Sequence, residues 1–187
     1  KIGEIDGIKN VFIFPHMGDG GLPAGAAMLA YHQLTGETKT PFDTVYLGPN
    51  YNDEEVKEAL DKYRDTINSC VVTNKAAVAI EDLINNKVVG WFEGRMEYGP
   101  RALGARSILY PGRDAAVNDW LNKRMSRTEF MPFAPVTPEE YAADCYIDWN
   151  PDHACAHFMT KTYNCTPNFQ QRHRAVVHVD GTARPQI

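Results

Sequence analysis

Residues 97–108 read EYGPRALGARSI and directly follow an apolar, strand-like segment. Within these twelve residues lie two guanidinium groups, two glycines, a proline and a serine hydroxyl. Arginine presents a planar fork of donors that matches phosphate or carboxylate, and glycine lets the backbone approach a ligand closely. We therefore predict that Arg101 and Arg106 bind closely spaced oxyanions. A solvated basic turn, whose arginines pair with surface acids, is the structural alternative.

The charge around this stretch favours the anion site. Residues 95–127 contain seven Lys or Arg residues and three acids, whereas the whole chain has a net charge of -5. The local excess is therefore not a property of the overall composition. A local basic excess in an acidic chain is typical of a surface that concentrates an anionic ligand, and it indicates phosphate chemistry.

A second candidate site lies near the start of the chain. An apolar segment at 11–15 predicts a strand, and residues 22–34 are small and apolar, as expected of a buried helix. Between them, Gly18, Gly20 and Gly21 form a turn that leaves N–H groups at the helix start for a phosphate or the edge of a nucleotide. The glycine spacing is neither that of a P-loop nor that of a dinucleotide site, so a tight structural turn remains the alternative.

The remaining pattern predicts scaffold. Asn52 and Glu55 form a capping box that begins an amphipathic helix. We place a domain boundary near Asp65, because the chain up to that residue has eleven acids and six Lys or Arg. Further elements are expected as a helix at 76–84, strands at 88–92 and 107–110, a helix at 114–125 that begins at an Asp114 cap, and a helix with Pro138 at its first position.

Composition limits the class of protein. A chain of 187 residues with 43 % hydrophobic content can bury a core as one domain or two small ones. No apolar run approaches the ~20 residues of a membrane helix, and the start lacks a signal-peptide profile, so we expect a cytoplasmic protein without a membrane partner. The four cysteines have no framework spacing, and we expect reduced thiols.

One cysteine has a metal-binding alternative. If residues 152–157 were a strand, His153, Cys155 and His157 would share a face and could bind zinc. The competing interpretation is a buried thiol between edge histidines.

Three ordered motifs carry a family resemblance. The stretch 99–109, the stretches 122–124 and 127–135, and the closing segment 178–184 together resemble the O-carbamoyltransferases of the nodulation and antibiotic-tailoring type. The resemblance implies an α/β (α+β) fold. Residues 1–65 would end a Kae-type domain of the actin-like ATPase superfamily, and residues 66–187 would form a YrdC-like domain with a twisted mixed sheet. It also implies a fragment, preceded by several hundred residues and truncated within the second domain.

The same resemblance implies the chemistry. Such enzymes form carbamoyl adenylate from carbamoyl phosphate and ATP with Mg, and pass the carbamoyl group to a hydroxyl of a small molecule. A divalent metal, iron or similar, would bind in the Kae-type domain with Asp19 as one ligand. Nucleic acid is not an expected partner, and a homo-oligomer is left open.

The resemblance assigns roles to individual residues. In the last turn of the predicted 114–125 helix, Lys123 and Arg124 either complement the helix dipole or extend toward the anion pocket. The catalytic set is Arg101, Arg106, Lys123 and Arg127, and the ligand contacts are Ser107, Arg124, Asp180, Thr182, Arg184, Gly18, Gly20 and Gly21.

This chain departs from the family pattern in two places that bear on those roles. Many relatives carry an arginine where this chain has Met131, and many carry a lysine near Met125 or Ser126. Lys123 is our candidate replacement for the missing arginine. Two other functions remain open: a non-catalytic nucleotide- or RNA-binding module, and a threonylcarbamoyl-adenylate synthase-like enzyme. A backbone-binding module would show steep salt dependence, but only Tyr98 and Tyr110 flank the arginines as stacking platforms.

Overall fold

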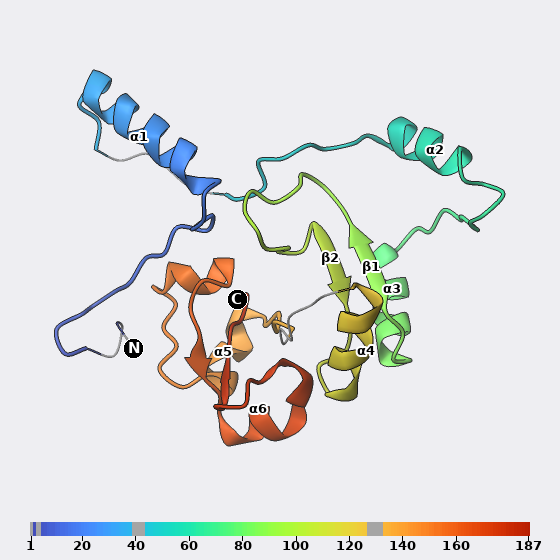
Figure 1. The fold of residues 1–187 in the computed structure, drawn as a ribbon. Coiled ribbons are helices and arrows are strands. Elements are labelled where there is room, and N and C mark those ends of the chain that lie inside the picture. Colours follow the sequence, from blue (N-terminus) through green and yellow to red (C-terminus); the bar gives the residue numbers. More distant parts are fainter. Residues whose placement is uncertain (1, 3–4, 39–43, 127–132) are drawn as a thin grey trace. The chain divides into compact units, whose positions relative to one another are not determined.

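The computed structural model describes residues 2, 5–38, 44–126 and 133–187 (Figure 1). The chain forms two compact units: residues 1–40 join residues 112–187 in unit 1, and residues 41–111 form unit 2. This division differs from the predicted boundary near Asp65. That boundary concerned the folds of two domains and stays a prediction.

Unit 2 contains two helices and a hairpin. Helix α2 (Asp53–Asp61) begins with the predicted capping box, in which Asn52 Oδ1 accepts from Glu55 N at 2.9 Å and Glu55 Oε2 accepts from Asn52 N at 2.8 Å. Helix α3 (Lys75–Ile84) follows an Asn74 cap. Strands β1 (Val89–Phe92) and β2 (Arg106–Leu109) pair antiparallel, which confirms the two predicted strands.

Unit 1 begins with helix α1 (Gly21–Thr35), which ends at Gly36 with a φ of 75°. The predicted helix is confirmed, but the prediction that it is buried is wrong. None of its residues is buried, and Leu34 is 87 % exposed. The apolar composition that suggested burial is spread around the helix, and no other described element of the unit covers it.

The predicted strand at 11–15 does not form in the described part of the chain. Two of its backbone groups bond the Cys155 side chain, and Val11 N donates to Asn10 Oδ1 at 2.7 Å. Cys155 Sγ donates to Val11 O at 2.9 Å and accepts from Ile13 N at 3.2 Å. Asn10 Nδ2 adds a bond to Asp152 O at 3.1 Å.

The carboxy-terminal part of unit 1 consists of short elements. Helix α4 (Ala116–Arg124) begins two residues after the predicted start, and the predicted Asp114 cap is wrong: Ala115 is the cap residue, although Asp114 Oδ1 accepts from Ala116 N at 2.9 Å. The predicted helix with Pro138 at its first position is a 3₁₀ turn that begins at Glu139, after Pro138. The α-helix α5 follows it and begins at Ala142. The remaining elements are η2 (Glu139–Tyr141), α5 (Ala142–Cys145), η3 (Ala154–Phe158), β3 (Tyr163–Asn164), α6 (Pro167–Arg172), η4 (Arg174–Val176) and β4 (Thr182–Ala183).

The observed class is a mixture of helices with small antiparallel sheets. Strands β3 and β4 form a second two-stranded pair, and Val136 and Gln186 form an isolated parallel bridge. The twisted mixed sheet that we predicted is absent among the described residues, because named strands of two to four residues pair only within these two hairpin-like ladders. No described helix has the length and apolar character needed to cross a bilayer.

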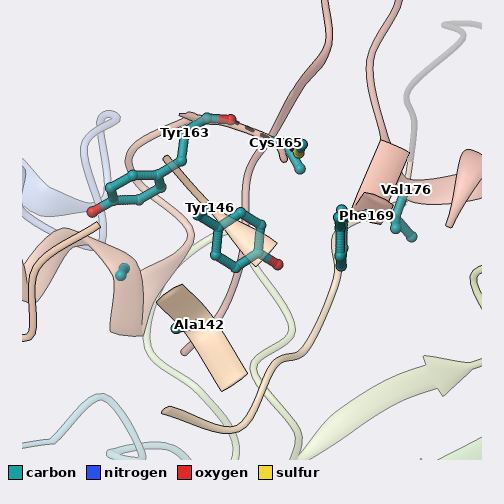
Figure 2. Close-up of a cluster of buried hydrophobic side chains, with 8 residues drawn as sticks. Ala142, Tyr146, Tyr163, Cys165, Phe169 and Val176 are labelled. Carbon is teal, nitrogen blue, oxygen red and sulfur yellow. Dashed lines mark hydrogen bonds between the residues drawn. The ribbon is translucent and has the colours of Figure 1, made fainter. Parts of the chain in front are cut away.

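The core of unit 1 is built around Tyr146, which is 2 % exposed. Figure 2 shows its ring between those of Tyr163 and Phe169, and the Tyr146–Phe169 centroids are 5.3 Å apart. The phenol pairs with buried Thr137, Oη to Oγ1 at 2.7 Å. Burial raises the pKa of Tyr146 and, to about 12, that of Tyr163. The hydroxyl of Tyr146 is thus a neutral partner inside an aromatic core.

The Tyr146–Thr137 pair can be tested by removing one partner and then both. Tyr146→Phe leaves the buried Thr137 hydroxyl without its partner, so we expect a loss of about 1–3 kcal/mol in the free energy of unfolding. Adding Thr137→Val should recover most of that loss, because two apolar groups then face each other. Urea unfolding followed by near-UV circular dichroism measures both. A double variant as unstable as the sum of the single variants would contradict this account.

Candidate functional site

A buried carboxylate organises the 97–108 loop in unit 2. Glu97 is 6 % exposed, and its Oε1 accepts backbone N–H bonds from Leu103 at 2.7 Å, Ala105 at 2.7 Å and Arg106 at 3.2 Å. Burial is the largest single influence and opposes ionisation of Glu97, but the backbone hydrogen bonds to the carboxylate together outweigh burial and lower its pKa. The loop is therefore closed around a negative charge that belongs to the chain itself.

The loop is held by further short bonds. Ser107 Oγ accepts from Gly104 N at 3.0 Å, and Gly104 has a φ of 105°, a conformation that favours glycine. Tyr46 Oη donates to Leu103 O at 2.7 Å. The predicted ligand contact Ser107 is thus part of the turn that shapes the loop.

Arg106 is engaged by the protein's own backbone. Its guanidinium donates to the carbonyls of Ala105 at 2.8 Å, Glu93 at 3.1 Å, Gly94 at 3.1 Å and Pro49 at 3.4 Å. It also lies 3.6 Å from the centroid of the Phe92 ring. These contacts favour a structural role, and oxyanion binding by Arg106 stays a prediction.

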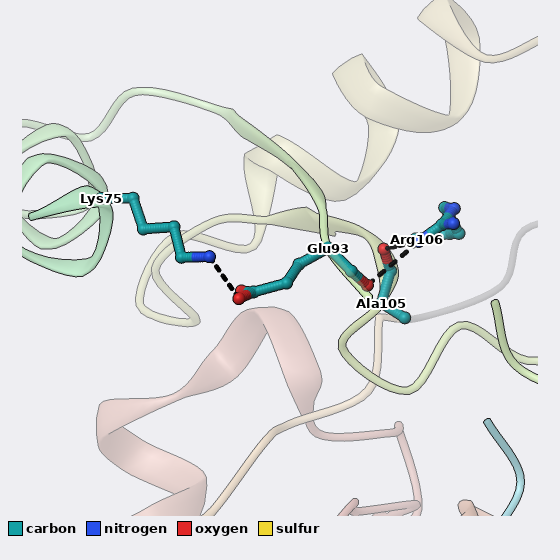
Figure 3. Close-up of polar contacts among 4 residues, drawn as sticks. All are labelled: Lys75, Glu93, Ala105 and Arg106. Atoms are coloured by element: carbon teal, nitrogen blue, oxygen red, sulfur yellow. Dashed lines mark hydrogen bonds and ion pairs between the residues drawn. The ribbon is translucent and has the colours of Figure 1, made fainter. Parts of the chain in front are cut away.

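Glu93 connects this network to the neighbouring helix. Figure 3 shows its carboxylate paired with Lys75 of α3, while its backbone carbonyl accepts a hydrogen bond from the Arg106 guanidinium. Arg95, which sequence reasoning did not single out, donates to Leu47 O at 3.1 Å and Gly48 O at 3.2 Å. Arg101 is half-buried, and its binding of an oxyanion stays a prediction.

The predicted cations of α4 lie in unit 1. Lys123 and Arg124 are exposed in the last turn of the helix, where positive charge complements the dipole. The Arg124 guanidinium also lies 5.6 Å from the Trp120 ring centroid. The predicted residue Arg127 and the departure at Met131 fall outside the described residues. That these cations share a pocket with Arg101 stays a prediction.

The closing motif forms a compact turn in unit 1. Asp180 Oδ1 accepts from Thr182 N at 3.0 Å and from Thr182 Oγ1 at 2.8 Å. The Arg184 guanidinium is half-buried, and its Nε is buried with no hydrogen-bond partner among the described residues. Burial lowers the pKa of Arg184. The structure therefore brings Asp180 and Thr182 together and leaves Arg184 suited to an anion, because buried charge requires a counter-charge.

The glycine-rich turn begins α1. Gly21 N donates to Gly18 O at 2.9 Å, and Leu22 N donates to Asp19 O at 3.1 Å. A Cβ on Gly21 would lie 1.9 Å from the His16 carbonyl oxygen, so this position requires glycine for packing. The geometry favours the tight structural turn, and the phosphate contacts predicted for Gly18, Gly20 and Gly21 stay predictions.

Two metal sites were considered from the sequence, one at Asp19 and one at residues 152–157. Asp19 is exposed, and the described residues contain no group of three or more His, Cys, Asp or Glu side chains arranged for a metal ion. The residues present therefore do not by themselves fit a metal at Asp19. The zinc alternative at 152–157 is wrong in its premise, because η3 is a 3₁₀ helix in which alternate residues do not share a face. Cys155 is a buried thiol, as the competing interpretation expected.

Sequence reasoning also missed a pocket of about 250 Å³ in unit 1, between α5 and α6. Asp144, Cys145, Arg172 and His173 are among its lining residues. Burial is the largest cause of two pKa shifts: it raises the pKa of Cys145 and lowers the pKa of His173. No predicted site residue lines this pocket, and no local sequence signal marks it, because two short helices create it only in the folded chain.

The Glu97 account predicts the effect of charge removal on stability. Glu97→Gln should cost about 1–3 kcal/mol of unfolding free energy, whereas Glu93→Gln, at an exposed ion pair, should cost about 1 kcal/mol or less. Because the folded pKa of Glu97 lies below its ordinary value of 4.5, its contribution is present above pH 4.5 and is lost as the pH falls through the folded value. Urea midpoints between pH 7 and pH 3 test this. Equal, pH-independent losses in both variants would contradict it.

The packing of Gly21 predicts opposite effects of one substitution at two glycines. Gly21→Ala places a methyl group against the His16 carbonyl and should lower the melting temperature. Gly25→Ala, inside α1 with nothing within 4 Å of the new Cβ, should stabilise by about 0.5–1 kcal/mol. Differential scanning calorimetry of both variants is the measurement. A neutral Gly21→Ala would show that the turn does not require glycine there.

Comparison with known proteins gives one consistent result. The family described as "Carbamoyltransferase C-terminus" matches residues 80–187, which include both the 97–108 loop and the closing motif. An uncharacterised protein, MJ1058, of Methanocaldococcus jannaschii is 35 % identical over 186 residues, covering 96 % of this chain and 30 % of its own length. Nodulation protein NolNO of Sinorhizobium fredii is 33 % identical, with 95 % of this chain and 26 % of its own length covered.

Nodulation protein U of Rhizobium fredii is 34 % identical, with 95 % of this chain and 28 % of its own length covered. The chain thus spans about a third or less of these relatives. The matched family covers more than half of the chain, and three separate relatives agree across nearly all of it. The chain belongs to the carbamoyltransferase family and corresponds to its C-terminal region.

Proposed function

We propose that the protein carrying this chain forms carbamoyl adenylate from carbamoyl phosphate and ATP and transfers the carbamoyl group to a hydroxyl of a small molecule. The observation that carries the proposal is the family match across residues 80–187. The proposal includes a cytoplasmic location, Mg with the ATP, and a divalent metal such as iron bound largely outside this chain. It also includes a Kae-type fold for residues 1–65 and a YrdC-like fold for residues 66–187.

The electrostatics of the reaction suit the basic residues of this region. Forming an acyl adenylate brings an anionic carbamoyl donor against the phosphates of a nucleotide, and fixed cations stabilise the charge that develops there. Arg101 in the 97–108 loop and Arg184 in the closing motif are the two guanidinium groups that we assign to anions. Both carry a buried Nε, so a bound anion would be shielded from water and held more strongly.

The two loop arginines then have separate tasks. Arg106 is used by four backbone carbonyls and an aromatic ring, so it shapes the loop. We assign the ligand contact to Arg101 because it lies in the region that the family matches. Lysine in place of Arg106 would supply the charge but not the planar fork that reaches several carbonyls at once.

The test compares arginine variants in pyrophosphate exchange. We expect the complete protein to exchange labelled pyrophosphate into ATP only when carbamoyl phosphate is present. Arg101→Ala should abolish exchange in a variant that circular dichroism shows to be folded, whereas Arg106→Lys should lose exchange together with about 1.5–3 kcal/mol of stability. Arg64→Ala, which removes an exposed arginine outside both motifs, serves as the matched control and should retain exchange.

Two results would contradict the proposal. A folded, ATP-binding protein without carbamoyl-phosphate-dependent exchange would exclude the adenylate mechanism. RNA binding that falls steeply with salt, in a protein without exchange, would favour the binding-module alternative. An Arg101→Ala variant with full exchange would leave the reaction in place and remove Arg101 from it.

A further inference from the structure

The pocket in unit 1 is framed by the way in which α5 and α6 are joined. Thr166, the cap residue of α6, donates its hydroxyl to Asp144 O at 2.8 Å and its backbone N–H to Cys145 O at 2.9 Å. These bonds fix the start of α6 against the end of α5, and the facing turns enclose about 250 Å³. Ligand pockets commonly measure ~300–1,000 Å³, so this one suits a small molecule.

The floor of the pocket is an aromatic surface that belongs to the core. Phe169 is 7 % exposed, and the centroid of its ring lies 5.3 Å from that of Tyr146 and 4.8 Å from that of His173. The His173 ring and the exposed Tyr141 also line the space. A short carbon chain on this surface would therefore be removed from water.

The two charged residues of the pocket lie at opposite ends of α6. Asp144 lies beside the α6 cap, whereas Arg172 is the last residue of the helix, six residues after Thr166 and ~9 Å along the axis. Neither charged side chain forms an ion pair or a side-chain hydrogen bond within the described parts of the chain. The pocket thus presents one negative and one positive group that do not pair with each other.

The thiol and the imidazole of the pocket add no charge near pH 7. Burial is the largest cause that raises the pKa of Cys145, and the charge of Asp144 adds to it. Burial is also the largest cause that lowers the pKa of His173, and the charges of Arg172 and Arg113 add to it. Because both groups are neutral, a ligand in the pocket meets the charges of Asp144 and Arg172 only.

We propose that this pocket binds a small zwitterion, with its ammonium group at Asp144 and its carboxylate at Arg172. The carbon chain between the two groups lies on Phe169. A guanidinium matches a carboxylate in geometry, and a ligand with both charges is attracted at both ends, whereas a simple anion or cation is repelled at one. The inference goes beyond the proposed function and does not rest on it, because no lining residue belongs to the 97–108 loop or the closing motif.

The test compares three ligands of equal chain length. The zwitterion is γ-aminobutyrate, while butyrate lacks the ammonium group and butylamine lacks the carboxylate. By isothermal titration calorimetry, the complete protein should bind γ-aminobutyrate about tenfold or more tightly than either of the others, the value of one hydrogen bond to a charged group.

Substitutions that remove one charge assign this preference to the pocket. Asp144→Asn should bind γ-aminobutyrate no more tightly than butyrate, and Arg172→Met should bind it no more tightly than butylamine. Asp148→Asn and Arg174→Met are the matched controls, because they remove the same charges at exposed positions that do not line the pocket. Both controls should keep the full preference. Melting temperatures establish that each variant is folded.

The outcomes are separate from those of the exchange experiment. A complete protein that does not bind γ-aminobutyrate, or binds it no more tightly than butyrate and butylamine, would overturn the inference. A preference that Asp144→Asn and Arg172→Met leave unchanged would also overturn it, because the ligand would bind elsewhere. A preference that the control substitutions reduce equally would do the same, because it would reflect overall charge. Each of these results leaves the proposed function in place, since pyrophosphate exchange tests that function.

Discussion

The candidate loop depends on one buried carboxylate. Three backbone N–H groups converge on a single oxygen of Glu97, and two of them belong to the buried residues Leu103 and Ala105. A buried amide without an acceptor is costly, so the loop has no comparable alternative conformation while that charge is present. Arg106 reinforces the arrangement from the other side through backbone carbonyls. A glycine-rich, basic segment that would otherwise be mobile is thereby given one shape.

Unit 1 uses the same principle with different groups. Side chains bond backbone groups of segments that lack regular strand partners. The Cys155 thiol bonds the backbone of residues 11 and 13, and the Asp180 carboxylate accepts from the backbone N–H of Thr182. The aromatic core around Tyr146 provides the apolar burial that these polar contacts do not. Short elements can therefore hold a defined motif because side chains replace the missing sheet hydrogen bonds.

Sequence reasoning succeeded where the cause is local. The Asn52 cap, the α3 helix and the two strands β1 and β2 follow from residues within a few positions of one another, whereas the pairing of β1 with β2 joins residues up to twenty positions apart. It failed where the partner is distant. The extended segment at 11–13 is held by Cys155, and α1 is exposed although its composition suggested burial.

The candidate site shows the same limit. The basic residues of 97–108 and the closing motif could be selected from sequence, but their division of tasks could not. Arg101 and Arg106 are the same residue type in one motif, and the carbonyl contacts that give Arg106 a structural role exist only in the folded chain. The role of Glu97 depends on a loop conformation, so it has no sequence signature.

The central claim of the proposed function is that two motifs, the 97–108 loop of unit 2 and residues 178–184 of unit 1, each contact a bound ligand. Hydrogen–deuterium exchange of the complete protein, with and without carbamoyl phosphate and a non-hydrolysable ATP analogue, tests it most directly. The account predicts slower amide exchange in both segments when the ligands are present and no change in α2, which serves as an internal reference. Unchanged exchange in both segments under saturating ligand, or protection confined to the α5–α6 pocket, would contradict it.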